Sequence, residues 1–153
     1  MATIISFKCN ECNFNFKTSG PHEFIYKNNI PMILPHPGYW GHCDGLLLNI
    51  FCFNCIENKE LIIVEYIDGN IENPFVTPLS NIKQKYLENY KDYIVDHPAR
   101  KDIPTECFSY KSIKCPDCFS ADIIYNSYIA CVECKNCPIC KTGSIETSQF
   151  IIT

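Results

Sequence analysis

The chain has 153 residues, 46% of them hydrophobic, with 17 acidic residues, 13 basic residues and a formal net charge of −4. This length suits one domain or two very small ones, and no apolar run approaches the ~20 residues of a membrane-spanning helix. Nucleic-acid binding draws most of its affinity from Lys and Arg on phosphates, so the acidic balance and a single arginine, Arg100, argue against it.

Twelve cysteines are the most unusual feature of the composition. The first eight residues have no basic segment followed by an apolar one, so no secretory signal is predicted and we expect a cytoplasmic protein. Thiols stay reduced in the cytoplasm, where clustered cysteines indicate metal binding rather than disulfides. Without its cysteines the chain has a modest apolar content, so metal sites are expected to replace part of a conventional core.

The first 73 residues are predicted to form an N-terminal module built on two Cys-x-x-Cys pairs. Such a turn points both sulfurs at one spot, and two facing turns make a tetrahedral site. We therefore expect one metal ion to be shared by Cys9, Cys12, Cys52 and Cys55. Strands are expected after each pair, at Phe14–Phe16 and in the β-branched run 61–67, and the apolar run 46–51 predicts a buried strand.

A long insert, residues 18–45, separates these two pairs. Its prolines, among them Pro31, Pro35 and Pro37, oppose regular ladder pairing and predict a loop. Long loops often carry function, and this one holds the only tryptophan, so we expect residues 24–44 to recognise a protein partner. The alternative is that its aromatic side chains, such as Trp40, complete a small core.

Residues 74–106 contain no cysteine and are predicted to form a helical linker. A hydroxyl and a proline at Thr77-Pro78 are typical of a helix start, and apolar residues recur at helical spacing from about Leu79 to Ile94. The expected fold class is therefore a small, metal-stabilised α+β protein in which one amphipathic helix joins two β modules.

The C-terminal module, residues 107–153, has more Cys-x-x-Cys pairs than one site can use. In a first arrangement Cys115 and Cys118 share a metal with Cys137 and Cys140, and strands form at 122–125, 128–130 and 144–152. In a second, Cys131 and Cys134 replace the last pair. A third is an iron–sulfur cluster held by the four evenly spaced cysteines between 131 and 140.

The sequences Lys114-Cys115-Pro116-Asp117-Cys118 and Cys137-Pro138-Ile139-Cys140 resemble the opening and closing knuckles of zinc-ribbon proteins, and a looser version covers residues 7–66. The resemblance implies two zinc ribbons with structural Zn²⁺. The cysteines left over in the first arrangement equal one further set of four, which allows a third zinc ion: Cys43, Cys107, Cys131 and Cys134.

The pairs also resemble those of rubredoxin, which implies iron and electron transfer as an alternative function. Rubredoxin-like turns usually place glycine after the second cysteine, and this difference favours zinc. The residues at that position are Asn13, Ile56, Phe119 and Lys141.

Complete sets of four cysteines leave a metal no open position, so we expect structural sites and a binding or adaptor protein rather than an enzyme. No Gly-rich phosphate loop, His-Glu-x-x-His helix or Gly-x-Ser-x-Gly elbow occurs. The one alternative is a site formed by His36, His42 and Cys43, which offers an open metal position or a nucleophile.

Overall fold

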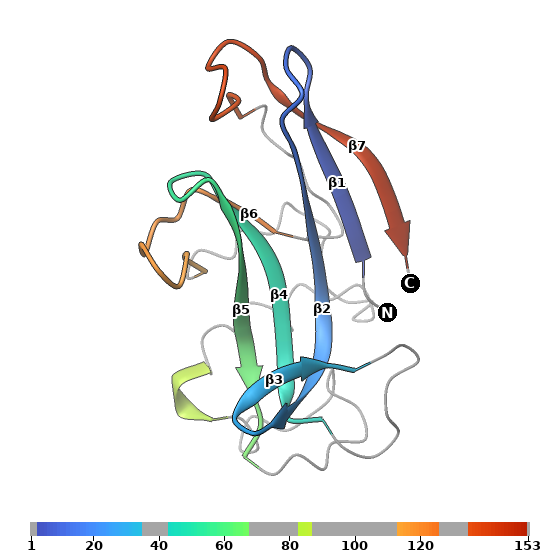
Figure 1. The fold of residues 1–153 in the computed structure, drawn as a ribbon. Helices are drawn as coiled ribbons and strands as arrows, with labels where there is room; N and C mark the ends of the chain where they lie inside the picture. The colour runs from blue at the N-terminus through green and yellow to red at the C-terminus, as the bar shows by residue number, and fades with distance from the viewer. Residues whose placement is uncertain (1–2, 35–42, 68–82, 87–112, 126–134, 153) are drawn as a thin grey trace, which may run out of the picture. The chain divides into compact units, whose positions relative to one another are not determined.

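The computed structural model describes residues 3–34, 43–67, 83–86, 113–125 and 135–152. Nearly all regular structure in these ranges is antiparallel β-sheet (Figure 1). The elements are β1 (Thr3–Cys9), β2 (Asn15–Lys27), β3 (Ile30–Ile33), β4 (Gly45–Cys52), β5 (Glu57–Glu65), a 3₁₀ helix η2 (Gln84–Tyr86), β6 (Ile123–Ile124) and β7 (Ile145–Ile152).

The strands follow the order β5-β4-β2-β1-β7, with β3 paired to β2 and β6 paired to β4. The chain divides into two compact units. The first unit comprises Met1–Pro21, Leu48–Leu61 and Lys114–Thr153, and the second comprises His22–Leu47 and Ile62–Ile113. The module boundaries predicted after residues 73 and 106 fall outside the described residues and stay a prediction.

The predicted helix that joins two modules is wrong in the described part of the chain. Of residues 79–94 the structure describes 83–86, where only the single 3₁₀ turn η2 forms. The ammonium groups of Lys83 and Lys85 approach the buried carboxylate of Glu65, at 2.5 and 3.6 Å, and the Lys83 N–H donates to the Glu65 carbonyl. These tertiary contacts override a helical pattern that is only a weak prior, and the α+β class is replaced by a nearly all-β fold.

The predicted loop over residues 18–45 is also wrong for its first part. Strand β2 continues through Pro21 to Lys27, and β3 returns along it from Ile30, with Lys27 opposite Ile30. Asn28 and Asn29 have φ values of 54° and 62°, the left-handed pair that a tight hairpin turn requires and that asparagine tolerates. Proline is compatible with this arrangement because β3 pairs only with β2 among the described strands. Residues 35–42 lie outside the described ranges.

Within the first unit the strands form two ribbon-like groups. The hairpin of β1 and β2 carries the Cys9–Cys12 turn at its tip, and β7 pairs antiparallel with the other edge of β1. The second group has the Cys52–Cys55 turn between β4 and β5, and the short β6 pairs with β4. The buried strand predicted at 46–51 is confirmed as β4, and the strand at 61–67 corresponds to the end of β5.

A stack of phenylalanine rings fills the core of the first unit. Phe16 lies between Phe7 and Phe51, with ring centroids 4.9 and 4.0 Å away. Phe14 and Phe53 close the edges of this stack. The stack packs against Cys9 and Cys137, which belong to the same buried cluster. Aromatic side chains therefore surround Cys9 and Cys137, and this packing positions the candidate metal centre that the two cysteines help to form.

Candidate metal centres

Each of the four Cys-x-x-Cys turns is attached to a strand of the first unit. Cys9 ends β1 and Cys52 ends β4, whereas the Cys115–Cys118 and Cys137–Cys140 turns come shortly before β6 and β7. Because the strands pair in register, the turns at their ends are brought face to face.

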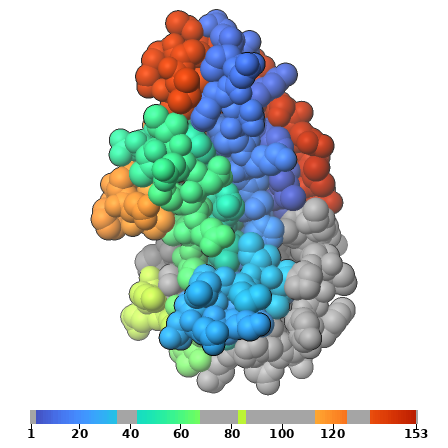
Figure 2. Space-filling view, viewed as in Figure 1, coloured from blue at the N-terminus to red at the C-terminus, as the bar shows by residue number. Residues whose placement is uncertain are grey.

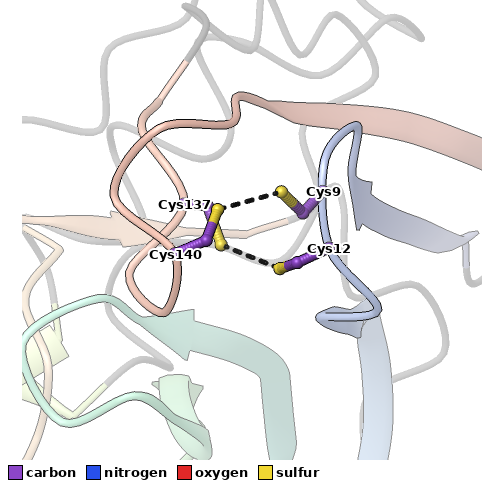
Figure 3. Close-up of side chains that lie close together, drawn as sticks. All are labelled: Cys9, Cys12, Cys137 and Cys140. Atoms are coloured by element: carbon purple, nitrogen blue, oxygen red, sulfur yellow. Dashed lines mark hydrogen bonds between the residues drawn. The ribbon is translucent and has the colours of Figure 1, made fainter.

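The eight cysteines form two groups of four, in each of which all sulfur atoms lie within 4.8 Å of one another. The terminal site consists of Cys9, Cys12, Cys137 and Cys140 (Figure 3), and the inner site of Cys52, Cys55, Cys115 and Cys118. In both sites one cysteine of each turn is buried and the other is partly exposed.

The sulfur–sulfur distances fit a single tetrahedral ion. They are 3.7 Å for Cys9–Cys140 and 3.7 Å for Cys12–Cys137 in the terminal site. In the inner site they are 3.6 Å for Cys52–Cys118 and 3.8 Å for Cys55–Cys115. A Zn–S bond of about 2.3 Å places tetrahedral ligands about 3.8 Å apart, whereas a disulfide needs about 2.05 Å. The donor set and its spacing therefore match a Cys₄ metal site, and the eight cysteines could hold two ions.

The pairing of the turns differs from the prediction. The sequence predicts that Cys9 and Cys12 share a metal with Cys52 and Cys55, the next pair along the chain. The structure instead pairs the first turn with the fourth and the second with the third, a nested arrangement. The prediction of neighbouring turns is wrong because β7 pairs with β1 and β6 pairs with β4.

The alternatives for the C-terminal cysteines change accordingly. Cys137 and Cys140 lie beside Cys9 and Cys12. They therefore do not form a site with Cys115 and Cys118, as in the first arrangement, or a cluster with Cys131 and Cys134, as in the third. Cys115 and Cys118 likewise face the second turn rather than Cys131 and Cys134, which lie outside the described residues and whose role as metal ligands stays a prediction.

Three of the four turns share a backbone geometry in which the residue after the second cysteine has a left-handed conformation. The φ values are 57° at Ile56, 57° at Phe119 and 65° at Lys141. In each case the N–H of that residue donates to the carbonyl of the first cysteine, at 2.8 to 3.1 Å. These are three of the four positions at which the sequence lacks the expected glycine. The turn forms without glycine, at the cost of an unfavourable conformation that is most marked for β-branched Ile56.

Hydrogen bonds lower the pKa of one thiol in each site. The Gly143 N–H, 3.3 Å from the sulfur, together with Thr142 lowers the pKa of Cys140 to about 6. The Ser120 N–H and the Asn54 side chain lower the pKa of Cys118 to about 6. In contrast, the hydrogen bond with Cys118 and partial burial raise the pKa of Cys55 to about 12. Four thiolates accumulate only when a cation compensates their charge, so metal binding would release protons from both sites.

Polar contacts tie the two turns of the terminal site together, and at the inner site they tie the Cys115–Cys118 turn to β5. At the terminal site, Asn10 donates from Nδ2 to the Ser144 hydroxyl (3.0 Å) and accepts from the Ser144 N–H through Oδ1 (2.9 Å). At the inner site, Lys59 Nζ lies 2.7 Å from both Asp117 and Glu57, and these carboxylates raise the pKa of Lys59. Each site is thus clamped by interactions that do not involve sulfur.

Cys43 belongs to neither group. It is buried, its thiol donates to the Gly45 carbonyl at 3.1 Å, and burial raises its pKa to about 11. This thiol is a poor nucleophile at neutral pH. His36 and His42, which the alternative site predicted from the sequence combines with Cys43, lie outside the described residues, as does Cys107.

No protein family model, no curated protein and no solved structure matches the chain. In the described ranges no helix has the length and apolar character needed to cross a membrane. The cysteine geometry is consistent with the zinc-ribbon-like turns that the sequence resembles.

Proposed function

We propose that this chain is a protein-binding module whose two Cys₄ sites hold structural Zn²⁺ ions. The observation that carries the metal assignment is the pair of four-sulfur groups with sulfur–sulfur distances of 3.6 to 3.8 Å. Four thiolates complete the tetrahedral shell of zinc and leave no position for water or substrate, which is the pattern of structural rather than catalytic zinc.

A second candidate function is electron transfer through iron, because a tetrahedral set of four thiolates also suits a single iron ion. The N–H groups that donate to sulfur, at Glu11 and Gly143, are compatible with either metal. Elemental analysis of the purified protein separates the two. We expect about two zinc ions per chain and a colourless protein, whereas a red, iron-loaded protein would replace the zinc proposal by the electron-transfer one.

The protein-binding part of the proposal rests on the β2–β3 hairpin in the second unit. Ile30 is 65% exposed, and Met32 and Ile33 are each 44% exposed. Tyr26 adds an exposed aromatic ring on the neighbouring strand. Adjacent apolar side chains in contact with water are typical of interaction surfaces, and methionine adapts readily to a partner. Pro31 lacks an N–H, so recognition through side chains is favoured over addition of a strand at β3. This hairpin begins the 24–44 segment in which the sequence predicted recognition.

A double variant, Ile30→Ser with Met32→Ser, tests this surface. Both side chains are exposed, so we expect the variant to keep two zinc ions and its β-sheet circular dichroism while it no longer captures the partner protein from cell extract. An Ile139→Ser variant, which changes an equally exposed side chain on a cysteine turn, is the matched control. Unchanged capture by the hairpin variant would contradict the assignment of the surface.

Charge argues against nucleic acid as the partner. The formal net charge is −4, and each zinc ion with four thiolates adds two negative charges, which gives about −8 for the loaded protein. Phosphate backbones would be repelled by this balance.

A further inference from the structure

Strand β7 forms an edge of the sheet. It pairs with β1 along one side, from Cys9 opposite Ile145 to Thr3 opposite Ile152, and no described strand pairs with its other side. Figure 1 shows β7 beside β1 as the outermost labelled strand, and Figure 2 shows its red atoms at the surface next to the blue atoms of β1. The outer side of such a strand presents backbone N–H and C=O groups that a further strand can use.

The exposed end of β7 is apolar on both faces. Phe150, Ile151 and Ile152 are 48%, 39% and 52% exposed. Successive residues of a strand point to opposite faces, so exposure of three in a row means that neither face of this end is covered. Water contact with these side chains is unfavourable, and cross-strand neighbours on a paired strand would reduce it.

The edge lacks most of the features that prevent strand pairing. Natural edges are protected by lysine, proline, inward-pointing charges or bulges. β7 contains no lysine, arginine or proline, and its only charged residue is Glu146. A bulge lies near its middle, where Ser6 pairs with Gln149 and Phe7 with Thr147. Beyond it, Gln149–Ile152 form an uninterrupted ladder on β1 and carry no charge.

We propose that β7 pairs with the β7 strand of a second copy of this chain, antiparallel and about a two-fold axis, to form a homodimer with a continuous sheet. Along each strand every second residue points its N–H and C=O groups toward the partner strand, and in an antiparallel pair such residues lie opposite one another. The two-fold axis therefore passes between one residue and the same residue of the second copy. An axis at Phe150 or Ile151 places apolar and uncharged side chains opposite one another.

Charge favours a second copy over a partner of other chemistry. With the axis in that stretch the two Glu146 side chains do not face each other, so self-pairing places no like charges in register. The edge also offers no basic or acidic row that a charged peptide would complement. The net charge of each metal-loaded copy, about −8, opposes association at long range, and this repulsion is screened by salt. Dimerisation should therefore strengthen as salt is added.

Analytical ultracentrifugation of the metal-loaded protein over a wide range of concentration tests the proposal, together with hydrogen exchange of the β7 amides. We expect a monomer–dimer equilibrium, stronger at high salt, in which β7 amides gain protection as the dimer forms. Ile151→Lys should raise the dimer dissociation constant by at least about tenfold, because two lysines would approach each other near the axis. Ile139→Lys, a similarly exposed site outside β7, should leave it unchanged.

Zinc content and circular dichroism of both lysine variants show whether each still folds. If the protein stays monomeric at every concentration, the proposal is overturned, and protected β7 amides in that monomer would assign the edge to another segment of the same chain. A dimer that Ile151→Lys does not weaken, or that Ile139→Lys weakens equally, would place the interface elsewhere and also overturn it.

Discussion

The sulfur atoms of Cys9 and Cys140 lie 3.7 Å apart although 131 residues separate them in the chain. The contact joins the turn at the end of β1 to the turn before β7, and so places both terminal strands of the described chain around one site. The inner site closes a shorter loop, since Cys55 and Cys115 are 60 residues apart.

The nested pairing predicts the metal content of double variants. Cys9→Ser with Cys137→Ser removes two ligands of the terminal site only, so about one zinc ion per chain should remain. Cys9→Ser with Cys52→Ser damages both sites, and zinc content should fall toward zero. Elemental analysis after gel filtration measures both values. Pairing of chain neighbours would give the reverse result.

Metal removal should unfold the first unit. Zinc binding contributes on the order of 10 kcal/mol to the folding of small zinc-binding peptides, and here the four cysteines of the terminal site belong to or pack against the buried cluster around Phe7 and Phe51. We expect a strong chelator with a reductant to abolish most β-sheet circular dichroism, and added Zn²⁺ to restore it. A metal-free chain with the melting temperature of the loaded protein would contradict a structural role for the metal.

Glycine at position 56 should stabilise the protein. Ile56 has a φ of 57°, which costs a β-branched residue on the order of 1–3 kcal/mol and glycine almost nothing. Glycine also increases the conformational entropy of the unfolded chain, which offsets part of this gain. The net effect of Ile56→Gly should be a free energy of unfolding that is higher by about 1 kcal/mol. Ile139→Gly, on a turn residue without a positive φ, should lower it. Urea denaturation of the metal-loaded proteins compares the two.

A methyl group at position 143 should weaken the terminal site selectively. A Cβ atom there would lie 2.5 Å from the Cys9 sulfur and 2.8 Å from Asn10 Oδ1, closer than atoms pack. Gly143→Ala must therefore displace a ligand, and overpacking of this kind typically costs about 1–3 kcal/mol. Competition with a chromogenic chelator should show one weakened and one unchanged zinc site. Weakening of both sites would indicate a general loss of folding instead.

The sequence was informative wherever a local signal exists. The Cys-x-x-Cys spacing identified the turns whose sulfurs now lie together, and the apolar run that became β4 predicted its own burial. Strand β1 was not predicted, although Ile5, Phe7 and Cys9 alternate on its buried face. This alternation of apolar residues is the local signal that predicts a strand at residues 3–9.

The pairing of the turns had no local signal. All four turns have the same spacing, so which two share a metal depends on pairing between strands that are distant in the chain, such as Cys9 with Ile145 and Cys52 with Ile123. The β2–β3 turn was missed for a different reason. Asn28-Asn29 is a weaker hairpin signal than Asn-Gly, and the nearby prolines suggested a loop.

Nesting of the two sites also has a consequence for synthesis on the ribosome. Cys9 and Cys12 emerge early but must wait for Cys137 and Cys140, which are translated near the end of this chain, whereas the inner site is complete once Cys118 has emerged. We therefore expect the inner ion to be acquired first, and the nascent N-terminal thiols to depend on reducing conditions until the last turn leaves the exit tunnel.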